Sequence, residues 1–157
     1  MAEASTIILA LLALAGPLVG VWMGRYMERS NEATKWRRDR CLEAYTDVLA
    51  TCNVVLTQAC NAFAMEEPTP QAIAQNTLLM TKVTEMHRAQ DKASLIASRE
   101  TDAALRRLTG HYFREIALRA IEIPKPSTDE WNKIIGVGAD LYGSFAALAR
   151  KDLGSVP

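Results

Sequence analysis

The sequence predicts an all-α protein, with a single N-terminal transmembrane helix followed by a cytosolic antiparallel bundle of about four helices. Three observations lead to this fold class. A run of 21 residues, from Ala4 to Gly24, carries no charge. Beyond it, apolar residues recur at alternating steps of three and four, which is the spacing of one helix face. No stretch of strand length alternates between apolar and polar residues, so no sheet is predicted.

The chain of 157 residues is long enough for an anchor and one domain with a core. We place the anchor at residues 1–27 and the bundle at residues 28–157. The net charge is zero, but all 18 Lys and Arg residues lie at or after Arg25. Residues 25–40 hold six basic and three acidic residues, and the remainder is close to neutral. Because nucleic-acid-binding domains are usually strongly basic, no nucleic-acid partner is expected.

The uncharged run has the dimensions of a membrane span. Twenty-one helical residues rise about 31 Å, the thickness of the hydrocarbon layer. Nine aliphatic residues favour insertion by roughly 0.3–0.6 kcal/mol each, a total of about −4 kcal/mol. Because basic residues follow the run, the positive-inside tendency places the N-terminus outside and the bundle in the cytoplasm. We therefore expect a single-pass protein of the inner (plasma) membrane.

Two alternatives compete with a retained anchor. A cleavable signal peptide needs basic residues before the apolar run and small residues at the cleavage site. Ala13-Leu14-Ala15 could supply such a site, but Glu3 is the only charged residue in front of the run. A buried helix of a globular domain is the second alternative, and 21 uncharged residues are long for one. A retained anchor is the expectation.

Three glycines share one face of the anchor. Gly16, Gly20 and Gly24 are spaced by four, which is a doubled GxxxG pattern that lets two helix backbones approach closely in lipid. Pro17 removes a backbone donor and predicts a kink. The pattern predicts a homo-oligomer, and the alternative is that the glycines are tolerated in a lone anchor.

The segment after the anchor, Trp36 to Tyr45, reads WRRDRCLEAY. It resembles small membrane proteins of actinobacteria and their phages. In these proteins a short glycine-containing span precedes a helix with W-x-R-x-x-R-x-x-A-Y-like residues and a helical bundle. The likeness covers about a third of the chain. It implies placement in the membrane and a helical fold, and it implies no catalytic residue.

The basic segment predicts contacts at the membrane surface. Trp36 and Arg40 are four residues apart, so the guanidinium can lie over the indole, and Arg40 can also pair with Glu43. Arg37 and Arg38 point elsewhere and could reach lipid phosphates. The alternative is a solvated face that only fixes the topology. The candidate contacts to the membrane surface or to a partner are Arg25, Arg29, Trp36, Arg37, Arg38 and Arg40.

The first two helices of the bundle follow from apolar stripes. The first is expected from Glu28 to Met65, with a stripe made of Leu42, Tyr45, Leu49, Cys52, Leu56, Ala59 and Phe63. Thr69 and Pro70 are a cap and a first residue typical of the start of the second helix. Its expected core residues are Ile73, Leu79 or Met80, Val83, Met86 and Ile96.

The third and fourth helices are set by a weak break near Ala97-Ser98 and by the segment 123–126, which contains two prolines. Leu105, Leu108, Tyr112 and Ile116 form the predicted core face of the third helix. Ser127 and Glu130 form a predicted capping box for the fourth. The fourth helix presents Trp131, Ile134, Leu141, Phe145 and Leu148 and ends at Gly154, and Gly136 and Gly138 are expected to permit close packing or a bend.

No motif for catalysis is found. Cys41, Cys52 and Cys60 lack a metal-binding spacing and are expected to be reduced and packed as small apolar residues. His87 and His111 belong to no metal motif. We therefore predict no catalytic residue, no cofactor and no metal.

Two functions fit these predictions. The first is a non-enzymatic, membrane-tethered helical interaction module at the cytoplasmic face, for which a phage or prophage origin is one expectation. The alternative is an oligomerising membrane effector of the phage exclusion, defence or lysis type, acting through the glycine face. The expected partners are membrane lipids, a second copy of the chain, and an unidentified cytosolic or membrane protein.

Overall fold

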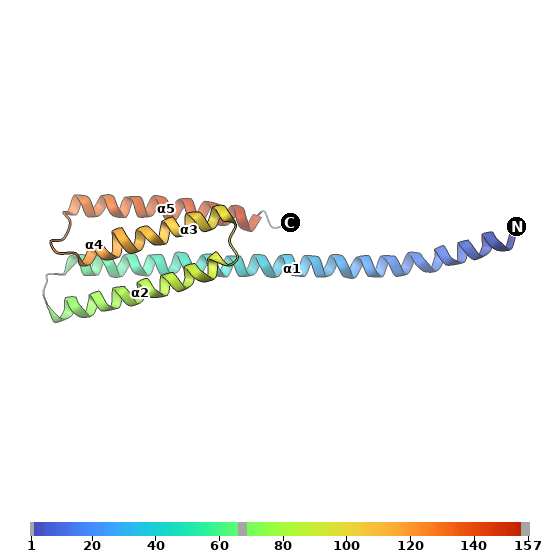
Figure 1. The fold of residues 1–157 in the computed structure, drawn as a ribbon, viewed down its shortest axis with the longest axis horizontal. Coiled ribbons are helices and arrows are strands. Elements are labelled where there is room, and N and C mark those ends of the chain that lie inside the picture. Colours follow the sequence, from blue (N-terminus) through green and yellow to red (C-terminus); the bar gives the residue numbers. More distant parts are fainter. Residues whose placement is uncertain (1, 66–68, 155–157) are drawn as a thin grey trace. The chain divides into compact units, whose positions relative to one another are not determined.

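The computed structural model describes the backbone of residues 2–65 and 69–154 and the side chains of residues 32–65 and 69–154. Its elements are α1 (Ala2–Ala64), α2 (Pro70–Ser94), α3 (Arg99–His111), the π-helical segment η1 (Tyr112–Ala117), α4 (Leu118–Ile121) and α5 (Thr128–Gly154). All of these elements are helical (Figure 1), so the all-α prediction is confirmed for the described part of the chain. The chain divides into two units, residues 1–38 and residues 39–157.

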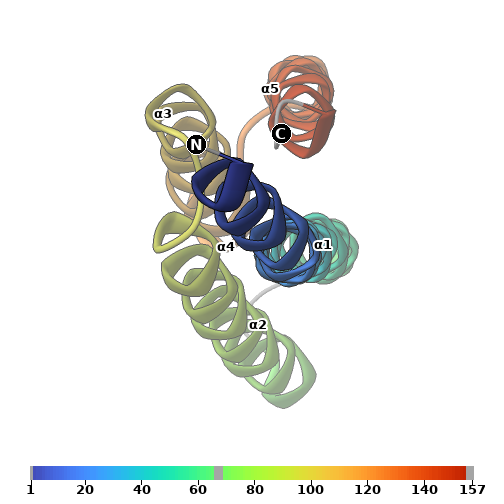
Figure 2. The ribbon, with the colours of Figure 1, turned by 90° about the vertical axis from the view of Figure 1, so that its right-hand side faces the viewer.

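The second unit is a bundle of four helical rods, because α3, η1 and α4 follow one another without a break. Figure 2 shows the rods of this unit end on. Rods that are consecutive in the chain run in opposite directions. On α1 and α5, Tyr45 packs edge-to-face on Phe145 with ring centroids 5.7 Å apart, and Phe63 stacks on Trp131 at 4.6 Å. The antiparallel bundle predicted from the stripes is therefore present.

The core face of α1 differs from the expected stripe. Tyr45, Cys52 and Ala59 are buried as predicted, but Leu42 is 52% exposed. The buried face is turned by about one residue, so it consists of Cys41, Tyr45, Val48, Cys52, Val55, Ala59 and Ala62. Most of these side chains are smaller than leucine, and interiors pack at high density, so α1 can lie close to its neighbours.

The predicted starts of α2, α3 and α5 are confirmed, whereas α1 begins at Ala2 and not at Glu28. Thr69 accepts a hydrogen bond from the Ala72 backbone N–H at 3.1 Å, and Pro70 is the first residue of α2. The Ser127 N–H donates to the Glu130 carboxylate at 2.9 Å, and the Glu130 N–H donates to Ser127 Oγ at 3.3 Å, which is the capping box. α3 begins after Ser98, where the break was predicted.

The core faces of the second and third rods are mostly those predicted. Leu105, Leu108, Tyr112 and Ile116 are all at most 2% exposed. On α2, Leu79, Val83 and Met86 are buried, which settles the choice between Leu79 and Met80. The prediction for Ile73 is wrong, since it is 64% exposed while Ala72 takes the neighbouring core position.

Among the described residues, no helix is both long enough and apolar enough to cross a membrane. The predicted anchor, residues 1–27, lies outside the residues whose side chains the structure describes, although its backbone from Ala2 on is part of α1. The membrane span and the domain boundary after residue 27 stay predictions.

Candidate functional site

The sites predicted near the N-terminus fall in different parts of the structure. Gly16, Gly20, Gly24, Arg25 and Arg29 lie outside the residues whose side chains are described. Among the other predicted residues, Trp36 is 64% exposed, and Arg37 and Arg38 are exposed as well; all three belong to the first unit.

Arg40 belongs to the second unit and makes the ion pair that was predicted for it. Its guanidinium donates to the Glu43 carboxylate at 3.1 Å. Both side chains are more than half exposed, so the pair contributes at most about 1 kcal/mol. The stacking of the Arg40 guanidinium on Trp36 stays a prediction.

At one end of the bundle, a carboxylate joins three rods. Asp152 of α5 accepts hydrogen bonds from Tyr45 Oη of α1 at 2.7 Å and from the Ser98 N–H, at the start of α3, at 3.0 Å. Burial raises the pKa of Asp152, but the hydrogen bonds from Ser98 and Tyr45 lower it by more, so the pKa lies below its usual value. The Asp152 carboxylate therefore holds this end of the bundle together in its charged form.

At the other end, a lysine caps α1. Lys125 Nζ donates to the carbonyls of Ala62 at 2.8 Å, Phe63 at 3.0 Å and Met65. The last carbonyls of a helix have no partner within it, and a cation there also complements the helix dipole. Lys125 is therefore committed to the fold and is a poor candidate for binding a ligand.

A hollow of about 470 Å³ beside this loop is lined by charged side chains whose charges are largely balanced. Arg119 lies 2.8 Å from Glu122 and 3.9 Å from Glu115. Glu130 is used by the capping box, and its hydrogen bonds with Ser127 lower its pKa. These contacts account for most of the lining, so the hollow offers no evident site for a charged ligand.

In the middle of the bundle, α5 packs closely against the π-helical segment. A Cβ atom on Gly138 would lie 3.0 Å from Ile116 Cδ1 and 3.4 Å from Tyr112 Cε2, so the close packing expected at this glycine is confirmed. His111 Nε2–H donates to the Ile134 carbonyl at 2.9 Å. Gly136 faces open space.

The thiols are packed much as expected. None of the three cysteines is part of a disulfide; Cys41 and Cys52 are buried and Cys60 is partly buried. Burial raises the pKa of Cys52 to about 12, so its thiol stays protonated and unreactive near neutral pH. Within the described part of the chain, no three His, Cys, Asp or Glu side chains are grouped so that they could hold a metal ion.

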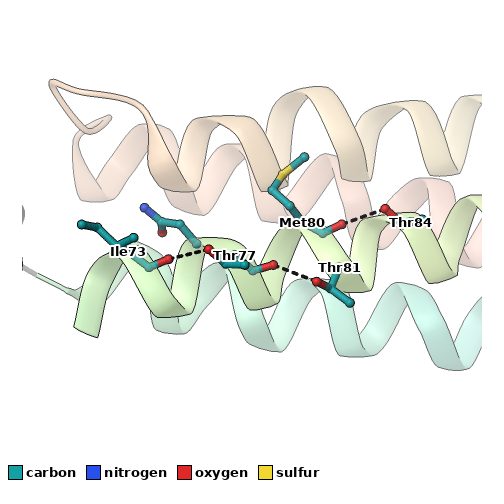
Figure 3. A pocket seen from close by; sticks show the side chains of 6 residues that line it. Ile73, Thr77, Met80, Thr81 and Thr84 are labelled. Atoms are coloured by element: carbon teal, nitrogen blue, oxygen red, sulfur yellow. Dashed lines mark hydrogen bonds between the residues drawn. The ribbon is translucent and has the colours of Figure 1, made fainter. Parts of the chain in front are cut away.

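An uncharged surface on α2 was not predicted from the sequence. Residues 48–65 and 69–81 include no Lys, Arg, Asp, Glu or His. On α2 this surface forms a shallow hollow of about 530 Å³ (Figure 3), which is lined by Ile73, Asn76, Thr77, Met80, Thr81 and Thr84. The absence of charge can be seen in the sequence, but which of these residues are exposed cannot, and Ile73 was predicted to lie in the core.

Comparisons of the chain with protein-family models, with curated proteins and with solved structures found no match.

Proposed function

We propose that the protein is a non-enzymatic, membrane-tethered helical interaction module of the inner (plasma) membrane. In this proposal residues 1–27 span the bilayer once with the N-terminus outside. The bundle is held at the cytoplasmic face, where it docks a second copy of the chain or another protein. Tethering raises the effective concentration of the bundle for such partners without any new contact.

The observation that carries the proposal is the uncharged run from Ala4 to Gly24 with the basic residues that follow it. Twenty-one residues without a charge match the thickness of the hydrocarbon layer. Arg25 begins a segment of net positive charge, which the positive-inside tendency retains on the cytoplasmic side. The division of the chain after Arg38 supports a tether and a separate bundle.

The basic segment supplies the proposed contacts at the membrane surface. Cations near an anionic leaflet gain about 1 kcal/mol each, and exposed tryptophan is typical of the headgroup region. The exposure of Trp36, Arg37 and Arg38 is compatible with this role. The proposed contacts are Arg25, Arg29, Trp36, Arg37, Arg38 and Arg40.

Charged substitutions in the apolar run test the tether. Arg at the centre of a span costs about 2.5–3.5 kcal/mol, so the double change Leu11→Arg and Leu14→Arg outweighs the insertion energy of about −4 kcal/mol. We expect the wild-type chain to stay in the membrane pellet after alkaline carbonate extraction and the double variant to move to the supernatant. The change Ala103→Arg, on the exposed surface of α3, is the matched control and stays in the pellet. A wild-type chain in the supernatant would refute the tether.

An oligomerising membrane effector is the second candidate, and the glycine spacing and Pro17 together are compatible with it. Gly16, Gly20 and Gly24 on one face permit several anchors to assemble, and Pro17 permits a bend that disturbs lipid packing. In this alternative the assembled anchors perturb the bilayer, as phage exclusion, defence or lysis proteins do. The same glycine face serves a dimeric module equally well.

A further inference from the structure

α2 carries two seams, and the bundle uses only one of them. The core seam includes Ala72, Leu79, Val83 and Met86, all buried. The second seam, made of Ile73, Thr77, Met80 and Thr84, repeats at steps of four, three and four, the spacing by which one helix packs along another. Ile73 is 64% exposed, Thr77 and Thr84 are exposed, and Met80 is half-buried. The spacing therefore fits a second helix lying along this face.

The threonine hydroxyls of this seam are turned back onto their own helix. Thr77 Oγ1 donates to the Ile73 carbonyl at 2.9 Å, and Thr84 Oγ1 donates to the Met80 carbonyl at 3.1 Å (Figure 3). Thr81 does the same to the Thr77 carbonyl at 3.0 Å. Because each hydroxyl proton already has an acceptor, a helix covering this face would leave no threonine donor unsatisfied.

Three of the four seam residues lie on a stretch of helix without charge. From Pro70 to Thr81, α2 carries no charged residue, and the first two beyond it, Lys82 and Glu85, bind each other at 2.8 Å. Of the three other rods, the third rod and α5 have charged residues along their exposed surfaces, whereas residues 48–65 of α1 carry no charge. A strongly charged partner surface would lose water here without gaining a counter-charge.

We infer that this seam is the contact between two copies of the chain, with α2 of one copy packed on α2 of the other. In a two-fold contact the same patch meets itself, so a charge close to the axis would face the same charge of the other copy. A patch without charge avoids that repulsion. The exposed face of α2 combines the spacing of a helix seam with the absence of charge.

This inference deepens the proposed function and rests on it. Twelve residues from Ile73 to Thr84 span about 17 Å of helix, and such a seam buries far less than the roughly 800 Å² per partner of a stable complex. The contact is therefore weak for free molecules. Anchoring both copies in one bilayer supplies the local concentration that it needs.

Disulfide crosslinking of the full chain in its native membrane tests the contact. Thr77 is near the middle of the seam and close to the two-fold axis, so two copies of the Thr77→Cys variant bring their new thiols together. We expect a crosslinked dimer at least fivefold more abundant than that of Ala103→Cys, which places a thiol on the exposed surface of α3. The three native cysteines are present in both variants and give the shared background.

A second substitution separates the seam from association through the anchor. Adding Ile73→Lys to Thr77→Cys puts a charge without a counter-charge into the seam, and we expect the yield to fall to that of Ala103→Cys. Adding Ile123→Lys, at an exposed apolar residue outside the seam, leaves the yield unchanged. Equal yields from Thr77→Cys and Ala103→Cys, or no effect of Ile73→Lys, would overturn the inference. These results leave the tether standing if carbonate extraction keeps the chain in the membrane, so the two failures are distinguishable.

Discussion

At the scale of single residues, one charged side chain at each end of the bundle binds backbone groups at the end of a helix. Asp152 is part of α5, and Lys125 lies in the loop before α5. Asp152 accepts the Ser98 N–H at the start of α3, and Lys125 donates to carbonyls at the end of α1. Each ion satisfies groups that a helix leaves without a partner, and each has the sign that the helix dipole favours. The connections are therefore held in place by helix termini as well as by apolar contacts.

Replacing Asp152 tests the contribution of its hydrogen bonds with Tyr45 and Ser98. In Asp152→Asn the charged acceptor of the Tyr45 and Ser98 hydrogen bonds is lost, and we expect the free energy of unfolding to fall by about 1–2 kcal/mol at pH 7. Denaturant unfolding of the full chain in mild detergent, followed by circular dichroism, measures this. Asp140→Asn, on the exposed surface of α5, is the control and should change stability by less than about 0.5 kcal/mol.

The pH dependence of this difference has a defined sign. The pKa of Asp152 in the folded state is below its ordinary value of 3.8, so its contribution is fully present above that pH. The contribution is lost as the pH falls through the folded-state pKa. We therefore expect the gap between the wild-type chain and Asp152→Asn to shrink in acid. A gap that stays the same at about pH 2.5 would mean that ionisation of Asp152 is not its source.

At the scale of elements, local signals predicted the starts of α2, α3 and α5 and most of the core of α2 and α3. On α5, Trp131 and Phe145 are buried as predicted. Thr69 with Pro70 and Ser127 with Glu130 act within one turn of the chain, so the sequence is sufficient to recognise them. The faces of α1 and α2 were less predictable. Leu42 and Ile73 were expected in the core because they are large and apolar, yet Cys41 and Ala72 are buried beside them. Which of two adjacent faces is buried depends on the partner rods.

The π-helical segment could not be predicted for the same reason. Within it, the Leu118 N–H donates to the Phe113 carbonyl five residues earlier, a geometry that is rare for an isolated helix. Tyr112 and Ile116 of this segment are buried close to Gly138. We attribute the wide turn to packing between the third rod and α5, which is a tertiary effect that no local signal encodes.

Two glycines of α5 give a matched test of this packing. Gly138→Leu forces a side chain against Ile116 and Tyr112, and we expect a loss of about 2 kcal/mol in the free energy of unfolding. Gly136→Ala meets no atom within 4 Å and removes the flexibility of glycine from a helix, so a gain of about 0.5–1 kcal/mol is expected. Denaturant unfolding of both variants measures the difference. A Gly138→Leu variant as stable as the wild-type chain would contradict the close approach.

At the scale of the whole molecule, charge is distributed in blocks along the sequence. An uncharged run is followed by a basic segment, residues 48–65 and 69–81 again carry no charge, and mixed charges cover the remainder. The first two blocks could be interpreted from the sequence, because a membrane span and its flanking cations have a recognisable order. The third needed the structure, which separates the exposed residues of α2 from those in the core.

The last prediction concerns the glycine face of the proposed anchor. Gly20→Leu places a large side chain at the centre of the doubled GxxxG pattern and prevents close approach of two helix backbones. We expect fewer oligomers that survive detergent, measured by chemical crosslinking of the full chain after extraction. Ala10→Leu, within the same run but outside the glycine face, is the control and should leave the yield unchanged. Crosslinking that is equal in all three proteins would remove the packing role of the glycines.

The same pair of variants decides between the module and the effector. An effector needs assembled anchors to perturb the bilayer, so its expression should arrest growth and collapse the membrane potential, and Gly20→Leu should relieve both effects while Ala10→Leu does not. A module held at the membrane by a single anchor leaves the potential intact whichever residue stands at position 20. Measuring the membrane potential with a voltage-sensitive dye during expression of the wild-type chain therefore separates the two, because only the effector requires the lipid itself to change.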